Sequence, residues 1–557
     1  MAIICNNEVV PEEKNILLDK WKFPSVDGEC EPEKPPMCMF YNTARALQLL
    51  FKHIKNNNKI VLGTDVDVDG IGTTYILKKS LTYLGSNNHV ILINQEKTHG
   101  IQENQVRFFN ERYKVDLVII TDSSSNELEL IKALKCDVLV IDHHDILHEE
   151  YFGKCNDGIH NFVIVNNNVD NFQQSIDIEW LNKIKPGAFD NIREYKAEPD
   201  MSCGLVVYEL MRVCFRAVGD ERTIENSLLY QWAGVTLFTD VINTLNDRNQ
   251  YYLNKTVFSR ETERALGSIL RAMNKFKATL DKSFITYSLA PIINKAIRAG
   301  KGAEAVDIVL NNPDNIMELK KYAKLQVNAI NKATTVEVVD SESGLRTLAP
   351  RVFTGKTIVM DITNMGIHSN YHGVIAGRLA GDTHKDAAVY TVLESGICSG
   401  SFRGIYKDVN YRKYFADFSS DIYAQGHPPA FGFKCTKEQL DEIMNTLYTI
   451  EPTEDPRPWI TAGNIKPEAR GIYHIDNMDE FRRAGYVWRI ATGNSKVSSQ
   501  DEINIRVSAI DVKLKETKGK LFIYDALGFE CKAFKPLSGS YFDIYLEYTN
   551  EITAYIR

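Results

Sequence analysis

The stretch VLVIDHH, residues 138–144, sets three polar side chains directly after an apolar run. Uninterrupted apolar runs of this kind are typical of strands that are buried on both faces of a sheet. Two further apolar runs end in the same way, one at Asp65 and one at Asp122. Because the carboxyl ends of parallel strands share one edge of a sheet, the sequence predicts that carboxylates and imidazoles gather there.

Apolar runs and helical stretches alternate over the first third of the chain. We expect strands at about 59–64, 89–94, 116–121, 137–141 and 162–166. We expect the intervening helices at about 71–84, 101–113 and 126–135. This alternation predicts right-handed βαβ units and an α/β fold with a parallel, doubly wound sheet. Ligands of such sheets bind at the carboxyl ends of the strands, where the acidic residues are expected.

The pattern divides the chain into five parts. An N-terminal extension covers residues 1–58, and the α/β domain covers 59–312. Residues 313–340 are expected to form a long connector helix, because their apolar residues recur at helical spacing. A smaller α/β domain follows at 341–455. Short β-like runs over 456–557, at about 486–491, 503–515, 520–525 and 541–548, predict a β-rich, OB-like module.

The composition indicates a globular protein of the cytoplasm. The 557 residues are 44% hydrophobic and 25% charged, and no apolar stretch is long enough to span a bilayer. No secretory signal is expected at the N-terminus, and the ten cysteines contain no C-x-x-C pair, which favours reduced core thiols. The net charge of −8 neither indicates nor excludes a nucleic-acid binder, because metal-binding carboxylates add to it.

The acidic and histidine residues at the strand ends form a candidate site for two divalent metal ions. Carboxylate and imidazole ligands without thiolates suit Mn²⁺ or Mg²⁺. Each residue alone has a simpler explanation, such as a helix cap or a calcium loop. An EF-hand is disfavoured, since its closing Glu is absent and the acidic segment follows a strand. The candidates are Asp65, Asp67, Asp69, Asp122, Asp142, Asp240, His143 and His144.

Short motifs along residues 58–450 resemble, in order, those of the DHH phosphoesterase superfamily and, within it, of the RecJ-type single-strand-specific exonucleases. The motifs are DVDVDG at 65–70, TD at 121–122, DHH at 142–144, TD at 239–240 with NDRN at 246–249, LAPIINKAIR at 289–298, HGVIAGR at 372–378, SGSFR at 399–403 and QGHPPAFG at 425–432. Their shared order makes the resemblance specific. It implies that 59–312 is a DHH catalytic domain and 341–455 a DHH-associated, substrate-binding domain.

The resemblance also implies roles for single residues. Asp142 is expected to be a metal ligand or to orient the histidines, and His144 to touch the scissile phosphate. These two residues and Asp122 are the expected catalytic residues. The ions, most often manganese in this family, are expected to be held by Asp65, Asp67, Asp69, Asp122, His143 and Asp240, with Asp142 as a further candidate.

A second set of residues is expected to bind the substrate. Arg298, Ser401 and Arg403 would hold a 5′ phosphate, because a guanidinium fork matches phosphate oxygens. His427, next to Gly426, would face the nucleotide. The chain departs from the family pattern at Lys295, Ile297, Gln425 and the serines at 123–125. These departures leave the metal ligands unchanged but alter the surroundings of the phosphate.

The resemblance therefore implies a metal-dependent hydrolase, namely an exonuclease that cuts the phosphodiesters of single-stranded DNA from 5′ to 3′. Two metal ions would activate the attacking water. Its expected role is in DNA repair or recombination. Two alternatives remain open. One is a small-substrate phosphoesterase, such as a nanoRNase or cyclic-dinucleotide phosphodiesterase, and the other is a non-catalytic, RecJ-like replication scaffold. RNA is an alternative substrate. A protein partner would bind through the N-terminal extension or the C-terminal module, and no membrane partner is expected.

Overall fold

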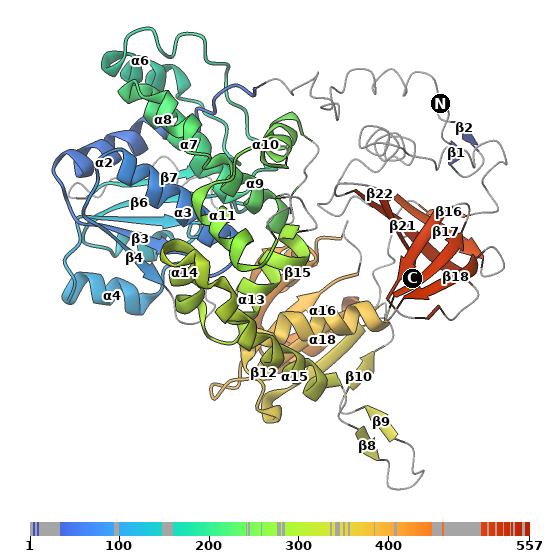
Figure 1. Cartoon of the computed structure of the whole chain (residues 1–557). Coiled ribbons are helices and arrows are strands. Elements are labelled where there is room, and N and C mark those ends of the chain that lie inside the picture. Colours follow the sequence, from blue (N-terminus) through green and yellow to red (C-terminus); the bar gives the residue numbers. More distant parts are fainter. Residues whose placement is uncertain are drawn as a thin grey trace. The chain divides into compact units, whose positions relative to one another are not determined.

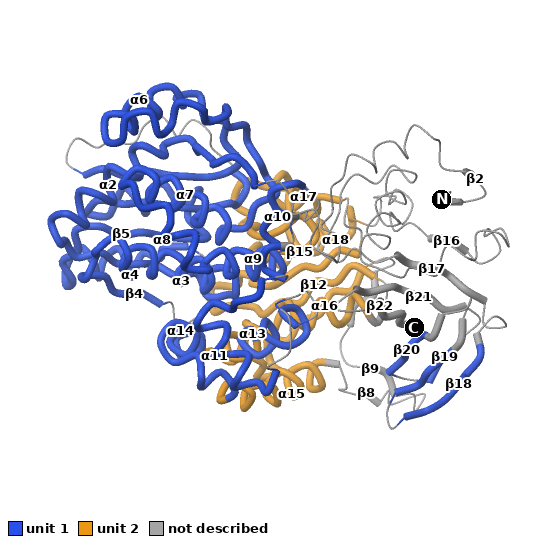
Figure 2. The backbone as a smooth tube through the Cα atoms, turned by 45° about the horizontal axis from the view of Figure 1, so that its top comes forward, with its two compact units in different colours: residues 1–294, 302–317, 458–557 blue, residues 295–301, 318–457 orange. Residues whose placement is uncertain are grey.

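The computed structural model describes residues 34–93, 100–146, 160–240, 246–257, 259–275, 284–334, 357–383, 385–405 and 409–447, with residues 242, 280 and some short segments elsewhere. The chain divides into two compact units, which Figure 2 colours separately. Unit 1 comprises residues 1–294, 302–317 and 458–557, and unit 2 comprises residues 295–301 and 318–457. No helix among the described residues is long and apolar enough to cross a bilayer.

A five-stranded parallel sheet forms the centre of unit 1 (Figure 1). Its strands are β3 (Ile60–Thr64), β4 (His89–Ile93), β5 (Leu117–Thr121), β6 (Asp137–Asp142) and β7 (Phe162–Asn166). The five strands and the parallel α/β class that the sequence predicts are confirmed. Every residue of β5, β6 and β7 is buried, as expected for strands that are covered on both faces.

Helices surround this sheet. They are α2 (Thr43–Lys55), α3 (Val68–Tyr83), α4 (Glu103–Glu111), α5 (Leu128–Lys132), α6 (Gln174–Ile184), α7 (Cys203–Val218), α8 (Glu221–Asn226), α9 (Tyr230–Thr239), α10 (Asp247–Val257), α11 (Arg264–Ala272) and α14 (Gly302–Asn311). Helix α3 packs against both α7 and α9. Most of α3 is therefore buried, although it lies next to the polar edge of the sheet.

The strand order β4-β3-β5-β6-β7 creates a topological switch point. The chain passes from β3 to β4 on one side and then returns across β3 to β5. Loops that leave β3 and β5 therefore turn away from each other and open a crevice at the carboxyl edge, where α/β sheets bind ligands. Asp65 directly follows β3, and Asp122 directly follows β5.

Asp240 lies at the end of a helix and not at the end of a strand. The apolar run before it suggested another strand, but these residues form α9, and Asp240 is the residue that ends this helix. Eight of its ten residues are buried, because α3, α7 and α10 pack around it. A helix that is covered on all sides has an uninterrupted apolar sequence, which short windows cannot distinguish from a buried strand.

Unit 2 contains a six-stranded mixed sheet in the order β10-β11-β12-β13-β15-β14. The strands are β10 (Arg351–Thr354), β11 (Thr357–Asp361), β12 (Asp386–Val392), β13 (Cys398–Arg403), β14 (Tyr423–His427) and β15 (Ala430–Cys435). Helices α15 (Ala323–Thr334) and α16 (His372–Thr383) share one apolar cluster with β11 and β12. Helices α17 (Tyr411–Phe418) and α18 (Lys437–Leu447) cover the opposite face.

Several aromatic residues of unit 2 are core residues. Phe402, Tyr411 and Phe415 are almost fully buried and belong to the cluster beneath α17 and α18. The ring centroids of Phe402 and Phe415 lie 5.4 Å apart, and those of Phe415 and Phe431 lie 4.9 Å apart. These side chains are not free to stack on a nucleic-acid base, since they are buried and pack against each other.

The remaining parts are smaller. The expected connector begins as a 3₁₀ helix (Pro313–Tyr322), which leads into α15. The C-terminal strands form one seven-stranded sheet, in the order β16-β17-β21-β22-β20-β19-β18. These strands are β16 (Trp459–Thr461), β17 (Ile503–Ser508), β18 (Val512–Lys518), β19 (Leu521–Ala526), β20 (Phe529–Ala533), β21 (Tyr541–Tyr548) and β22 (Ile552–Ile556). This confirms a β-rich module, whereas its OB-like character stays a prediction. The strand expected at 486–491 lies outside the described residues, as does most of the N-terminal extension before residue 34.

At the amino edge of the first sheet, an ion pair links strand β6 to helix α2. Asp137, at the start of β6, accepts hydrogen bonds from Lys52 Nζ at 2.7 Å and from His53 Nε2 at 2.9 Å, both on α2. Its second oxygen accepts a bond from the amide of Asn161. Burial alone would raise the pKa of Asp137, but these donors outweigh burial and hold the pKa well below its usual range.

We predict that Asp137→Asn lowers the free energy of unfolding by about 1–3 kcal/mol at pH 7, because buried donors lose a charged acceptor. A depressed carboxyl pKa stabilises the folded state above the unfolded-state pKa of about 3.9 and stops doing so as the pH falls. The difference between the two proteins should therefore shrink below about pH 4. Urea denaturation at several pH values measures it, with the surface variant Asp441→Asn as the control.

Candidate metal centre and phosphate pocket

The carboxyl edge of the first sheet carries three buried carboxylates. Asp65 follows β3, Asp122 follows β5, and Asp142 is the last residue of β6, and none of them is more than 4% exposed. Asp122 has a φ of 63°, in the left-handed region that residues other than glycine rarely adopt. Its amide donates a hydrogen bond to the carbonyl of Ile141, which holds this turn in place. Strained backbone of this kind is often found at functional sites.

The first turn of α3 supplies two more carboxylates. Asp67 precedes α3 and caps it by accepting a hydrogen bond from the amide of Gly70 at 2.9 Å. Asp69 accepts hydrogen bonds from the amides of Cys203 at 3.0 Å and Gly204 at 3.1 Å, which open α7. The carboxylate of Asp69 is thus fixed by the positive end of a second helix.

Eight side chains of the sequence motifs were expected at this edge, and seven of them offer converging ligand atoms. The structure forms three groups, within each of which the ligand atoms lie within 4.8 Å of one another. The groups are Asp65, Asp67 and Asp122; Asp69, His143 and Asp240; and Asp122, His143 and His144. Asp122 and His143 each belong to two groups, so adjacent metal positions would share ligands.

His143 is oriented as a metal ligand. Its Nδ1–H donates a hydrogen bond to the carbonyl of Met201 at 2.9 Å, which leaves the lone pair of the neutral ring on Nε2. That Nε2 lies 3.2 Å from Asp122 Oδ1 and 3.3 Å from Asp240 Oδ2. A backbone carbonyl thus fixes the tautomer that a metal ion requires.

Asp142 orients its neighbours and is not part of any of the three groups. One of its oxygens accepts a hydrogen bond from the amide of Ser125 at 3.0 Å. The other accepts bonds from the amides of His143 and His144 and from His144 Nδ1, the last at 2.8 Å. Both oxygens are therefore engaged by the protein. The imidazole of His144 is held through Nδ1, and its side chain is 27% exposed.

The electrostatics of this cluster fit divalent cations. Burial, together with the charges of Asp69 and Asp67, raises the pKa of Asp122 well above its usual range. Burial also raises the pKa of Asp69, with the charges of Asp240 and Asp67 acting in the same direction although His143 opposes them. Carboxylates crowded in this way repel one another, and a divalent ion between them would remove the repulsion. Oxygen and imidazole donors suit Mn²⁺ or Mg²⁺.

Two asparagines that sequence reasoning did not select hold the histidines in place. Asn166 Nδ2 donates to the carbonyl of His144 at 3.0 Å, and Asn168 Nδ2 donates to the carbonyl of His143 at 2.9 Å. Asn166 ends β7 at the same sheet edge as the acids. Its position at a strand end could therefore have marked it as a site residue. It was not selected because the Asn-rich segment that follows is typical of an ordinary loop.

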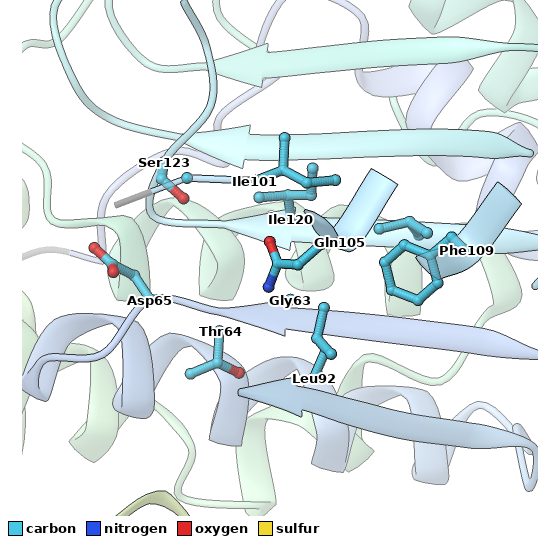
Figure 3. A pocket seen from close by; sticks show the side chains of 11 residues that line it. Gly63, Thr64, Asp65, Leu92, Ile101, Gln105, Phe109, Ile120 and Ser123 are labelled. Carbon is cyan, nitrogen blue, oxygen red and sulfur yellow. The ribbon is translucent and has the colours of Figure 1, made fainter. Parts of the chain in front are cut away.

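A small cavity lies beside Asp65 (Figure 3). Leu92 and Phe109 line it together with the side chain of Gln105, and Ser123 lies at its rim. Its volume is about 20 Å³, which is enough for about one water molecule. A nucleobase would not fit, so this cavity is not a substrate pocket.

The substrate-binding candidates belong to unit 2, where three of them come together near the start of α16. Arg403 ends β13, and Ser401 lies two residues before it on the same face of the strand. A Cβ atom on Gly373, in the first turn of α16, would lie 2.5 Å from Arg403 Nη2 and 3.5 Å from Ser401 Oγ. Arg298 is in electrostatic contact with Arg403 and donates a hydrogen bond to Gln326 at 3.2 Å.

The two half-buried guanidinium groups bring two positive charges close together. Burial lowers the pKa of Arg403 to about 10, and the charge of Arg298 acts in the same direction. Among the described residues, neither arginine has an acidic partner within ion-pair distance. Nearby, Tyr371 Oη and His372 Nε2 are buried and find no hydrogen-bond partner among the described residues. Such groups are costly to bury unless an anion is bound.

His427 and Gly426 lie on β14, at the edge of the same sheet. Gly426 has a φ of 129°, and an added Cβ would lie 2.9 Å from the carbonyl of Ala430, so only glycine fits there. Its carbonyl accepts a hydrogen bond from Arg412. Gly426 therefore shapes the strand, while its neighbour His427 presents a side chain. Of the departures from the family pattern, Ile297 is buried and Lys295 is half-buried.

We predict that Asp122→Ala weakens the binding of Mn²⁺ by more than about tenfold, because it removes a ligand shared by two groups. Titration calorimetry of the full chain with MnCl₂ measures this directly and does not depend on activity. The surface variant Asp441→Asn should bind Mn²⁺ like the unmodified protein. Equal affinities for Asp122→Ala and the control would contradict the assignment.

Comparison with known proteins agrees with this arrangement. Residues 59–238 match the model of the DHH family, N-terminal domain. YorK of the SPbeta prophage in Bacillus subtilis (strain 168), provisionally named a single-strand DNA-specific exonuclease, is 23% identical over 442 residues, which cover 73% of this chain and 69% of YorK. Its counterpart in Bacillus phage SPbeta matches to the same extent.

Solved structures show the same fold. RecJ of Thermus thermophilus in complex with Mn²⁺ superimposes with a TM-score of 0.62 and 16% identity, covering 94% of this chain and 72% of RecJ. The complex of the same protein with Mg²⁺ gives a TM-score of 0.56 and 15% identity, covering 94% and 71%. Residues 59–238 therefore match the DHH family, N-terminal domain, and the chain is similar in fold to RecJ.

Proposed function

We propose that this protein is a metal-dependent exonuclease that hydrolyses the phosphodiester bonds of single-stranded DNA, starting from a 5′ phosphate. The observation that carries the proposal is the pair of half-buried, neighbouring guanidinium groups, Arg298 and Arg403, without an acidic partner among the described residues. A chain that also gathers buried carboxylates has one site suited to metal ions and one suited to phosphate. Both are needed to cut next to a charged end.

In this proposal, the DHH domain (59–312) carries out hydrolysis. Asp65, Asp67, Asp69, Asp122, His143 and Asp240 would hold two divalent ions. Two such ions supply an activated water and neutralise charge on the scissile phosphate. Asp142 keeps the ring of His144 in one orientation, so that Nε2 can donate or accept a proton at a phosphate oxygen.

The DHH-associated domain (341–455), with Arg298, would bind the end of the substrate. A terminal phosphate carries more negative charge than an internal phosphodiester and matches two neighbouring guanidinium groups better. Ser401 Oγ and the amides at the start of α16 add neutral donors, and helix N-termini attract anions. Tyr371 Oη and His372 Nε2 are further donors that the ligand would satisfy.

The similar proteins support this choice of substrate and metal. YorK is provisionally named a single-strand DNA-specific exonuclease, and RecJ binds Mn²⁺ and Mg²⁺ in its crystal structures. Manganese is the ion we expect here, because the three groups of converging ligand atoms consist of carboxylates and imidazoles and contain no thiolate.

We predict that the protein degrades 3′-labelled, 5′-phosphorylated single-stranded DNA in the presence of Mn²⁺, and that excess EDTA abolishes the activity. Denaturing gels give the product ladder and hence the polarity. Asp122→Ala should lose at least about 10³-fold in rate, because a shared metal ligand is removed. Asp441→Asn should retain full activity.

The same assay separates the alternatives. Preferential cleavage of a dinucleotide over a long strand would indicate a small-substrate phosphoesterase, and the same substrates made of RNA test the choice of sugar. An absence of hydrolysis with every divalent ion, in a protein that does not bind Mn²⁺, would indicate a scaffold and refute the proposal.

We predict that Gly373→Ala reduces the preference for 5′-phosphorylated over unphosphorylated strands by about tenfold. The new methyl group would displace the guanidinium of Arg403, which is the flexible end of a side chain, so the fold should survive. Arg403→Ala should remove the preference altogether, since it deletes one of the two neighbouring charges. Rates on both substrates measure the ratio, and Gly377→Ala, whose added Cβ meets nothing within 4 Å, is the control.

A further inference from the structure

Among the described residues, helices leave one face of the unit 2 sheet partly uncovered. Along β13, buried and half-buried residues alternate strictly, and β15 shows the same alternation. The buried set, which includes Phe402, Phe431 and Phe433, packs beneath α17 and α18. The alternate residues therefore point to the opposite face. Helix α16 covers that face over β12 and contacts β13, while β14 at the edge remains half-exposed or exposed.

The strand register arranges the residues of this face, which we call the open sheet face, in three rows. Each row crosses β13, β15 and β14 in turn. The rows are Arg403, Ala430 and His427; Ser401, Gly432 and Gln425; and Ser399, Lys434 and Tyr423. The first row begins at the guanidinium group that lines the phosphate pocket, so the face is continuous with that pocket.

The middle strand of the open sheet face, β15, carries two small residues. Ala430 and Gly432 on β15 have almost no side chain, and an added Cβ on Gly432 would meet no atom closer than 3.8 Å. On this face β14 carries the larger side chains of His427 and Gln425, whereas β13 carries Ser401 and Arg403. The small residues Ala430 and Gly432 thus leave space beside the larger side chains of β14, and we call this strip of the open sheet face the track.

The far end of the track carries an exposed aromatic ring next to a cation. Tyr423 is 46% exposed, which is unusual in a domain whose other large aromatic residues are mostly buried. Its hydroxyl is hydrogen-bonded to Gln425, and Lys434 Nζ lies 5.5 Å from the centre of its ring. An exposed ring beside a cation is the combination that holds single strands, because the ring stacks on a base and the cation meets a phosphate.

The distance along the face separates this end from the terminal phosphate. Arg403 and Tyr423 are two strands apart and four residues apart along the strand direction. With ~4.8 Å between strands and ~3.4 Å per residue, their Cα atoms lie roughly 17 Å apart. This exceeds the step between neighbouring phosphates of a single strand, so a base on Tyr423 belongs to a nucleotide beyond the first.

We propose that the open sheet face is a track for the substrate strand, in which Tyr423 stacks on a base beyond the first nucleotide and Lys434 contacts the backbone phosphate beside it. This inference rests on the proposed function for the position of the terminal phosphate. Its contacts do not depend on base identity, because every base has a stacking face. The track selects for strand length and not for sequence.

Binding measurements on the full chain in EDTA test the track without hydrolysis. Unlabelled 5′-phosphorylated oligothymidylates of two and eight nucleotides compete with a fluorescent single strand, and anisotropy reports the displacement. Tyr423→Ala should weaken the binding of the octamer by about tenfold or more and change the affinity for the dinucleotide by less than about twofold. Tyr423→Phe should bind the octamer as tightly as the unmodified protein, because it keeps the ring. Tyr83→Ala, at a tyrosine of matched exposure on α3, should change neither.

The salt dependence tests the cation. Lys434→Ala should lower the slope of log Kd against log salt for the octamer by about one, because one phosphate contact is lost. Lys413→Ala, on α17 over the opposite face, should leave the slope unchanged. Equal octamer affinities for Tyr423→Ala and the unmodified protein, or no octamer binding at all, would overturn the track. Length-dependent binding without hydrolysis in Mn²⁺ would refute the exonuclease and leave the track standing.

Discussion

The repulsion between buried carboxylates at the carboxyl edge of the first sheet is the constraint on which unit 1 depends. Asp65, Asp69 and Asp122 lie within an apolar framework that water scarcely reaches. The protein offsets part of the repulsion with amide donors, since Asp69 accepts two hydrogen bonds from the start of α7. The remaining negative charge is what attracts divalent cations. The packing of α3 against α7 and α9 thus serves to hold charges together that would otherwise separate.

Unit 2 presents the opposite charge. Arg298 and Arg403 are held within a mostly buried setting next to the N-terminus of α16, and neither has an acidic partner among the described residues. Among the described residues, each unit therefore contains one cluster whose charge is not balanced by ion pairs. Divalent cations would balance the carboxylates of unit 1, and the terminal phosphate of the proposed substrate would balance the arginines of unit 2.

Much of the site could be predicted from the sequence, because strand ends are visible as the ends of apolar runs. The five strands of the first sheet and the acids after β3, β5 and β6 follow from this rule. Asp240 reaches the same site from α9, which the rule assigned to a strand. Asn166 and Asn168 were not selected, since their role is to bind carbonyl groups of residues that are distant in the chain. The rows that join Arg403 to Tyr423 require the register of three strands, which no local pattern encodes.

The sequence by itself determined the class of fold and the chemical character of the site: apolar runs specify buried parallel strands, and the acids and histidines that follow them specify hard metal ligands. Only the tertiary structure decided which oxygen of each carboxylate is already bonded, and hence that Asp142 orients His144 while Asp122 remains available to a metal ion. It also decided which aromatic rings are core and that Tyr423 is exposed. The physical reason is that hydrogen bonding and burial depend on neighbours in space, whereas a sequence pattern records only neighbours along the chain.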